Sequence, residues 1–201
     1  MLTLYGDRRS GNCYKVELLL HLLERHHHYI EVDILAGDTR TPEFLTRNVN
    51  GKIPLLELHR GETLSESNAI LNYLADGSDY LPSDPFLRAK VLQWQFFEQY
   101  SHEPYIATAR FINRYLGLPD ERRAEYAAKQ DGGKRALRVM EHHLAEHDWL
   151  VGDRFTIADI SLYAYTHVAD EGGFALDDYP AIQAWLASVA AQPGHFDIPR
   201  D

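Results

Sequence analysis

Three short polar segments near the N-terminus carry side chains whose types and spacing suit the binding of a small charged molecule. In the first, Ser10-Gly-Asn-Cys13, a hydroxyl stands where a strand-like run gives way to a helical pattern. Backbone N–H groups at a helix start lack partners and carry partial positive charge, so they attract anions such as a thiolate. The same hydroxyl is also a common N-cap that only satisfies those N–H groups. The segment fits sulfur chemistry and simple capping alike.

The second segment, Asn50–Leu56, places Pro54 at the start of a strand. Proline in this position can be a device of an edge strand. It can also follow a cis peptide bond that exposes the backbone of the preceding residue, Ile53, to an extended ligand. Lys52 offers a positive charge for a carboxylate. We predict that the Ile53–Pro54 bond is cis and that Ile53 presents its N–H and C=O to the ligand.

The third segment, Leu64–Ile70, begins a helix directly after a strand. Ser67 and the nearby N–H groups can bind a carboxylate, while Glu66 can bind an ammonium group. Together they can hold the head group of an amino acid, which carries both charges. The pattern is equally that of a capped helix. Each of the three segments is weak evidence alone, and their order along the chain is the informative feature.

The elements that must position these segments follow a recognisable order. Strands, helices and a hairpin turn at Arg60-Gly61 are indicated by the hydrophobic period and the turn residues. The order βαβ-α-ββα predicts a thioredoxin-like α/β domain with a mixed sheet over residues 1–76. The expected strands are 2–5, 29–34, 53–58 and 63–64, and the expected helices are 12–24, 43–47 and 65–75.

Residues 77–87 are rich in Gly, Ser and Pro and predict a linker, and residues 88–201 predict an all-α domain. The expected helical stretches are 88–114, interrupted or kinked at Pro104, 120–147 with a weak point at Gly132-Gly133, 156–165 and 180–190. Thr156-Ile-Ala-Asp159 has the pattern of a capping box, with a role in folding.

Composition narrows the class of function. The formal net charge of −10 argues against a nucleic-acid partner, because phosphate binding needs clustered Lys and Arg. The apolar runs are too short to span a bilayer, and the N-terminus lacks the pattern of a signal peptide. The single cysteine, Cys13, excludes an internal disulfide and suits a reducing compartment. We therefore expect a cytoplasmic protein without nucleic-acid or membrane partners.

Taken in order, Ser10–Val16, Asn50–Leu56 and Glu66–Ile70 resemble the glutathione transferase superfamily of the cytosolic type, in particular its bacterial, nu-class-like or theta-like members. The resemblance continues at Asp148–Asp159, so it covers nearly the whole chain. It implies glutathione as co-substrate and a homodimer that pairs the first domain of each subunit with the second domain of the other.

The resemblance also implies roles at the sulfur. Ser10 would donate its hydroxyl hydrogen bond to the glutathione sulfur, and Asn12 occupies a second polar position near it. Ile53, beside a cis Pro54, would pair its backbone with the cysteinyl part. Tyr5 is the alternative helper, because some classes place a catalytic Tyr near the end of the first strand. The Ser in the following loop favours Ser10, and Tyr5 is then a packing residue.

For the two ends of glutathione, the resemblance implies that Glu66 and Ser67 hold the γ-glutamyl head. Lys52 would reach the glycyl carboxylate, with assistance from Arg40. We expect a glutathione transferase that attacks an electrophile or reduces a disulfide or peroxide, and the sequence leaves these reactions open. The alternative is a non-catalytic glutathione-binding or regulatory protein of the same fold. The acceptor pocket is also open, since Tyr100, His102, Tyr105 and Arg110 fit either a pocket or a core.

Other reactive side chains receive structural interpretations. Ser10-x-x-Cys13 resembles a Cys-x-x-Cys motif whose first, nucleophilic cysteine is replaced, so we interpret Cys13 as a small buried apolar group. The run His26–His28 precedes the second predicted strand and is interpreted as solvated. His143 and His147 fit an H-x-x-E-H zinc pattern, yet the family register puts them at a solvent-facing helix end. We predict no metal site.

Overall fold

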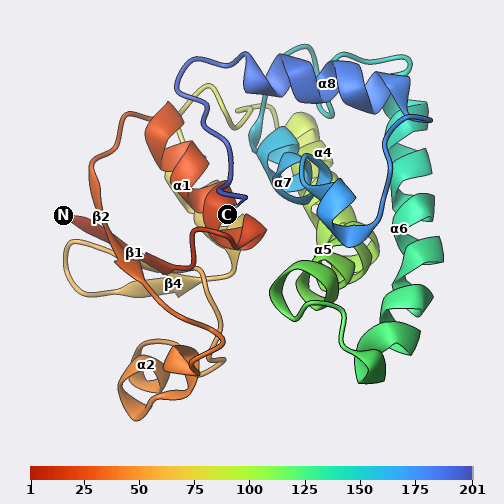
Figure 1. Ribbon diagram of the computed structural model, residues 1–201. Helices are drawn as coiled ribbons and strands as arrows, with labels where there is room; N and C mark the ends of the chain where they lie inside the picture. The colour runs from red at the N-terminus through yellow and green to blue at the C-terminus, as the bar shows by residue number, and fades with distance from the viewer. Residues whose placement is uncertain (201) are drawn as a thin grey trace. The chain divides into compact units, whose positions relative to one another are not determined.

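The computed structural model describes residues 1–200, which divide into two compact units (Figure 1). The first comprises Met1–Asp76 together with the C-terminal segment from Pro193, and the second comprises Gly77–Gln192. The C-terminal segment joins the first unit because the Tyr14 hydroxyl donates to the carbonyl of Phe196 at 2.7 Å. Residues 77–87, which we expected to form a linker, fall within the second unit, where the Ile157 N–H donates to the carbonyl of Tyr80 at 3.0 Å.

The first unit contains a four-stranded mixed sheet of order β2-β1-β3-β4, which confirms the thioredoxin-like prediction. Strand β1 pairs in parallel with β2 and antiparallel with β3, and β3 pairs antiparallel with β4. Strand β2 ends before the predicted Ile34, because the Asp33 carboxylate accepts the N–H groups of Leu35 and Ala36 and turns the chain. The strands are β1 (Leu2–Gly6), β2 (His27–Glu31), β3 (Leu55–Glu57) and β4 (Thr63–Ser65).

Three helices complete this unit, and the two that begin at the polar segments, α1 and α3, pack against each other. Their inward faces bury Val16, Leu20 and Leu74 completely. Because α1 is buried on most of its surface, even Lys15 and Glu17 are buried in it. The helices are α1 (Gly11–Leu22), α2 (Pro42–Arg47) and α3 (Ser67–Ala75), with a 3₁₀ turn η1 (Asp38–Arg40).

The second unit is all helical over its described residues, as predicted. Helix α7 lies at its centre, because every residue of α7 is buried. The long helix α6 packs beside α5, and α8 packs on α6 and α7 (Figure 1). Its helices are α4 (Pro85–Phe97), α5 (Glu103–Arg110), α6 (Arg123–Leu144), α7 (Ile157–Thr166) and α8 (Pro180–Ala190). Its other turns are the π-helical η2 (Glu98–His102) and η3 (Phe111–Tyr115) and the 3₁₀ turns η4 (Asp120–Arg122) and η5 (Ala169–Gly172).

Within residues 1–200, no helix combines the length and apolarity that a membrane span requires.

Two expectations for this unit have different outcomes. Near Pro104, where we expected the helix to be interrupted or kinked, the chain stays helical but changes its hydrogen-bond pattern: the π-helical turn η2 joins α4 to α5, and the Glu103 N–H donates to the Glu98 carbonyl just before Pro104. The predicted weak point at Gly132-Gly133 is wrong, because α6 is continuous there. A Cβ on Gly132 would overlap the ring of Tyr105, and one on Gly133 the ring of Phe174. These glycines allow the two aromatic rings to pack directly against the backbone of α6.

The capping box at the start of α7 is confirmed, with reciprocal bonds between Thr156 and Asp159. The fully buried Asp159 carboxylate also accepts from the Leu150 N–H and from the Trp185 ring N–H, each at 3.0 Å. It therefore ties α7 to α8 and to the segment before α7. Burial raises the pKa of Asp159 to about 6 against the opposing effect of these hydrogen bonds.

Candidate functional site

The loop before α1 holds Ser10 at the N-cap of that helix. The buried carboxylate of Asp7 accepts from the backbone N–H of Arg9 at 2.9 Å and from its guanidinium, while the Asp7 carbonyl accepts from the Ser10 N–H at 2.9 Å. Ser10 Oγ accepts from the Cys13 N–H at the long distance of 3.5 Å. That contact uses a lone pair of Oγ, so the O–H can still be donated. Capping and donation to a sulfur are therefore compatible at Ser10.

Asn12 joins two of the three polar segments. Its Oδ1 accepts from the Ser67 hydroxyl at 3.2 Å and from Lys15 Nζ at 2.8 Å. Because an ammonium group only donates, the atom beside it must be the amide oxygen, and Nδ2 is then the donor end of Asn12. The starts of α1 and α3 thus meet at one side chain.

Lys15 is a residue of the candidate site that the sequence interpretation did not include. Its side chain is fully buried, and it places a positive charge within the first turns of α1. Its signal in the sequence is a lysine three residues after Asn12, inside a helix that is otherwise mostly apolar. Both the ammonium charge and the helix start favour an anion in this region.

The start of α3 is set by an unusual backbone conformation at Glu66, with φ 68° and ψ 111°. A positive φ at a residue other than Gly costs about 1–3 kcal/mol and is concentrated at functional sites. The Glu66 side chain is exposed, whereas Ser67 is buried and bonded to Asn12. The geometry presents one acidic side chain beside a hydroxyl at a helix start.

The peptide bond between Ile53 and Pro54 is cis, as predicted. Strand β3 begins at Leu55 rather than at the predicted Ile53, so the backbone of Ile53 lies outside the sheet ladder. Its side chain packs against a buried cluster that includes Val32 and Phe44. Ile53 is therefore held by its side chain at the end of the sheet.

Two cations are exposed in this region: Lys52, directly before Ile53, and Arg40, the last residue of η1. Asn48 fixes the loop: its Nδ2 donates to the Lys52 carbonyl at 2.7 Å, and its Oδ1 accepts from the Asn50 N–H at 3.1 Å. Arg40 Nη1 donates to the Asn50 carbonyl at 3.5 Å. Gly51 has φ +60°, and a Cβ there would meet the Arg40 guanidinium. Lys52 and Arg40 thus belong to one loop assembly.

Tyr5 is engaged elsewhere in the first unit. Its hydroxyl donates to Glu57 Oε2 at 3.0 Å, and its ring packs edge-on against Phe44. Burial and the Glu57 carboxylate both raise the pKa of Tyr5. A hydroxyl that donates to a carboxylate is turned toward that carboxylate, so this geometry favours the packing role of Tyr5.

Cys13 is fully buried, and burial raises the pKa of its thiol to about 12. A thiol with that pKa is almost entirely protonated at neutral pH and is a poor nucleophile. The geometry supports the structural interpretation of Cys13.

Two of the pocket candidates in the second unit are internal. His102 Nε2 lies 2.9 Å from Thr166 Oγ1, and Arg110 Nε donates to Glu171 at 2.6 Å, with both side chains buried. Tyr100 and Tyr105 instead line a cavity of about 280 Å³. The structure therefore separates core residues from cavity residues in a set that the sequence left undivided.

Two family models match the chain. Residues 1–76 match the model described as "Glutathione S-transferase, N-terminal domain", and residues 93–193 match "Glutathione S-transferase, C-terminal domain". The chain belongs to the glutathione S-transferase family. A crystal structure of a glutathione S-transferase from Pseudomonas fluorescens Pf-5 is 61% identical, with a TM-score of 0.96 over 98% of both chains.

Two more distant relatives differ from this chain in a bound ligand or in length. A glutathione transferase family member from Pseudomonas fluorescens Pf-5, solved with two glutathione molecules bound, is 28% identical, with a TM-score of 0.82 over 96% of this chain and 89% of that one. Protein URE2 of Kluyveromyces lactis is 29% identical over 95% of this chain. The chain spans 59% of the length of that relative.

Proposed function

We propose that this protein is a glutathione transferase-type enzyme in which Ser10 stabilises the thiolate of bound glutathione. The observation that carries the proposal is the hydrogen bond from Ser67 to Asn12, which joins the starts of α1 and α3. It places the residues suited to an amino-acid head group beside those suited to a sulfur. The glutathione-bound relative of the same fold supports glutathione as the ligand.

In this proposal, glutathione is held along the first unit by groups of matching charge. Glu66 binds the ammonium of the γ-glutamyl head, and the N–H groups at the start of α3 bind its carboxylate. The Ser67 hydroxyl has a single proton, which turns from Asn12 Oδ1 to this carboxylate when glutathione binds. The backbone of Ile53 pairs with the cysteinyl part. Lys52 and Arg40 bind the glycyl carboxylate. The sulfur then lies at the start of α1.

The chemical task at the start of α1 is to favour the thiolate over the thiol. A free thiol has a pKa near 8.5, and each unit of lowering requires about 1.4 kcal/mol. The Ser10 hydroxyl donates to the sulfur, Asn12 Nδ2 offers a second donor, and the helix start and Lys15 add positive potential. Ser10 need not ionise. The thiol proton leaves to solvent, and the sulfur then forms a bond to carbon as the leaving group departs, or to sulfur as a disulfide breaks.

The direct test measures binding and turnover separately. Calorimetry with reduced glutathione should show binding to the untagged protein, and assays with an aryl halide, a disulfide and a peroxide should identify the reaction. Turnover with any of the three supports the enzyme. Glutathione binding without turnover in all three assays would instead support the non-catalytic alternative, and the absence of binding would overturn both.

Ser67→Ala should weaken glutathione binding by about tenfold to a hundredfold, because a hydrogen bond to a charged group contributes about 1.5–3 kcal/mol. The change in kcat should be smaller, since the head group is remote from the reacting sulfur. Calorimetry and steady-state kinetics give the two quantities. Ser188→Ala is the matched control, since that hydroxyl bonds only within α8, to the Ala184 carbonyl at 3.1 Å. Equal affinity in the two variants would contradict the role of Ser67.

We further propose a homodimer, supported by an apolar stripe on the second unit. Leu92, Phe96 and Tyr100 follow one another at intervals of four residues, and Phe96 and Tyr100 are 68% and 85% exposed. Exposed aromatic side chains in a row are typical of interaction surfaces. Light scattering should give twice 23.1 kDa for the protein. Phe96→Asp should lower the mass toward one chain, whereas Leu35→Asp, at another exposed apolar residue, should not. A single-chain mass for the unmodified protein at micromolar concentration would refute the dimer.

A further inference from the structure

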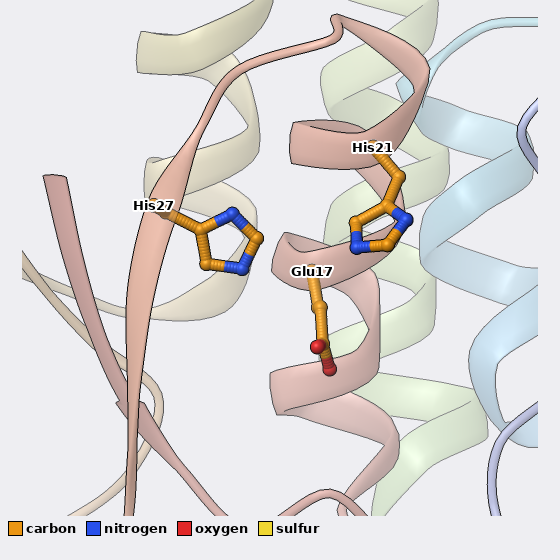
Figure 2. Close-up of side chains that lie close together, drawn as sticks. All are labelled: Glu17, His21 and His27. Carbon is orange, nitrogen blue, oxygen red and sulfur yellow. The ribbon is translucent and has the colours of Figure 1, made fainter.

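The end of α1 and the start of β2 bring together three side chains that the glutathione site does not use. Glu17, His21 and His27 each place a ligand atom within 4.8 Å of the other two. Figure 2 shows the two imidazole rings with nitrogen atoms turned toward each other, above the Glu17 carboxylate. Two imidazoles and one carboxylate converge on one point from two elements.

The sequence positions explain this convergence. Glu17 and His21 are four residues apart on α1, so they lie on the same face of that helix. His27 is the first residue of β2, and alternation along the strand sends His28 to the opposite side. The interpretation of His26–His28 as three solvated residues before the strand is therefore wrong for His27, which is half-buried, whereas His26 and His28 are exposed.

We propose that Glu17, His21 and His27 bind a divalent transition metal, with Zn²⁺ as the expected ion. Two histidines and one carboxylate form a known ligand set for four-coordinate zinc whose last position is taken by water. Imidazole suits Zn²⁺, Ni²⁺ and Cu²⁺, whereas Ca²⁺ and Mg²⁺ prefer ligand sets made of oxygen. The donor types thus select the class of ion.

The hydrogen bond of His27 prepares one ring nitrogen for a metal. His27 Nδ1 lies 3.2 Å from the carbonyl oxygen of Arg25. Since a carbonyl oxygen only accepts, this bond requires the proton on Nδ1 and leaves the lone pair on Nε2. A histidine that binds a metal through one nitrogen commonly donates the other N–H to a carbonyl in this way. Ligands about 2.1 Å from a tetrahedral zinc lie about 3.4 Å apart, so a modest rotation of the exposed His21 closes the site.

Arg8 also contacts the Glu17 carboxylate, with Nη1 2.6 Å from Oε1. The carboxylate has a second oxygen, so Arg8 can stay in place and orient Glu17 while Oε2 binds the ion. The Arg8 charge is also shared with Glu31, whose carboxylate lies 3.8 Å away. The bound ion would connect the last turn of α1 to the first residue of β2.

The test is a calorimetric titration of the untagged, chelator-treated protein with Zn²⁺, which should show one ion per chain at micromolar concentration. His21→Ala and His27→Ala should each weaken this binding by about tenfold or more, because loss of the groups that merely orient ligands already costs that much. Glu17→Gln should weaken it too. His26→Ala and His28→Ala are matched controls on the same segment and should bind as the unmodified protein does. Co²⁺ should give the intense visible bands of four-coordinate geometry.

The proposal is overturned if His21→Ala and His27→Ala bind Zn²⁺ as the controls do, or if the Zn²⁺ affinity is lost with His147→Ala instead. His143 and His147 are the competing pair, but their rings stack with centroids 4.2 Å apart and planes 2° apart. Melting temperatures without metal should be equal in the histidine variants and controls, which separates lost ligation from lost folding. Binding of glutathione is independent of this result.

Discussion

Ser10→Ala should lower kcat for the glutathione-dependent reaction by about one to two orders of magnitude, because a charge-assisted hydrogen bond contributes about 1.5–3 kcal/mol. The affinity for glutathione should change by less than about tenfold, since Glu66, Ser67 and Lys52 still hold its two ends. The interaction that is lost forms chiefly with the thiolate. Steady-state kinetics and calorimetry on the same preparations measure the two effects.

The ultraviolet absorbance of bound thiolate gives a second readout for Ser10→Ala. The pKa of bound glutathione should rise toward the value of the free thiol, near 8.5. Tyr5→Phe is the control and should change the activity and the pKa of bound glutathione very little, because the Tyr5 hydroxyl donates to Glu57. If Tyr5→Phe abolished activity while Ser10→Ala did not, the assignment of Ser10 would be wrong, although the fold and the ligand would stand.

Asp159→Asn should lower the free energy of unfolding by about 3–5 kcal/mol, because it leaves two of the donors that face the carboxylate without an acceptor in a buried place. Asp159 accepts from Leu150, Trp185 and both the N–H and hydroxyl of Thr156, at 2.9–3.1 Å. An amide of the same shape turns an N–H₂ group toward donors. For a chain of this length the melting temperature should fall on the order of 10 °C.

Calorimetric unfolding at pH 8 measures this change with the wild-type carboxylate ionised, since its pKa is raised only to about 6. Asp153→Asn is the matched control: its side chain is 96% exposed and lies 3.8 Å from the exposed Arg154 side chain. Melting temperatures within about 2 °C of each other for the two variants would contradict the proposed role of Asp159 in joining α7 to α8.

The strand and helix order of the first unit could be predicted because the spacing of apolar residues changes from a strand period to a helix period, as it does at Ser10. Pro54 and the Arg60-Gly61 turn also mark where strands begin and end. The burial of Cys13 was also predictable, since a small thiol in an apolar helix has few alternatives. The ends of β2 were less predictable, because Asp33 ends the strand by bonding to the backbone of a turn.

Contacts between distant segments could not be predicted. The hydrogen bond between Asn12 and Ser67 joins residues 55 positions apart. Nothing in the type of either residue indicates that the other is its partner. The grouping of His27 with α1 depends on strand register, which a run of three identical residues conceals. Gly132 resembled a helix breaker, because the ring of Tyr105 that requires its missing side chain comes from another helix.

The return of the C-terminal segment to α1 makes the first unit discontinuous along the chain. During synthesis, Tyr14 leaves the ribosome early, whereas its acceptor, the carbonyl of Phe196, lies 182 residues later. The first unit therefore cannot reach its complete form until the whole helical unit has been made. A gene fragment that stops at Asp76 would encode the sheet without the segment that covers Tyr14, and a faithful minimal version would have to carry both ends of the chain.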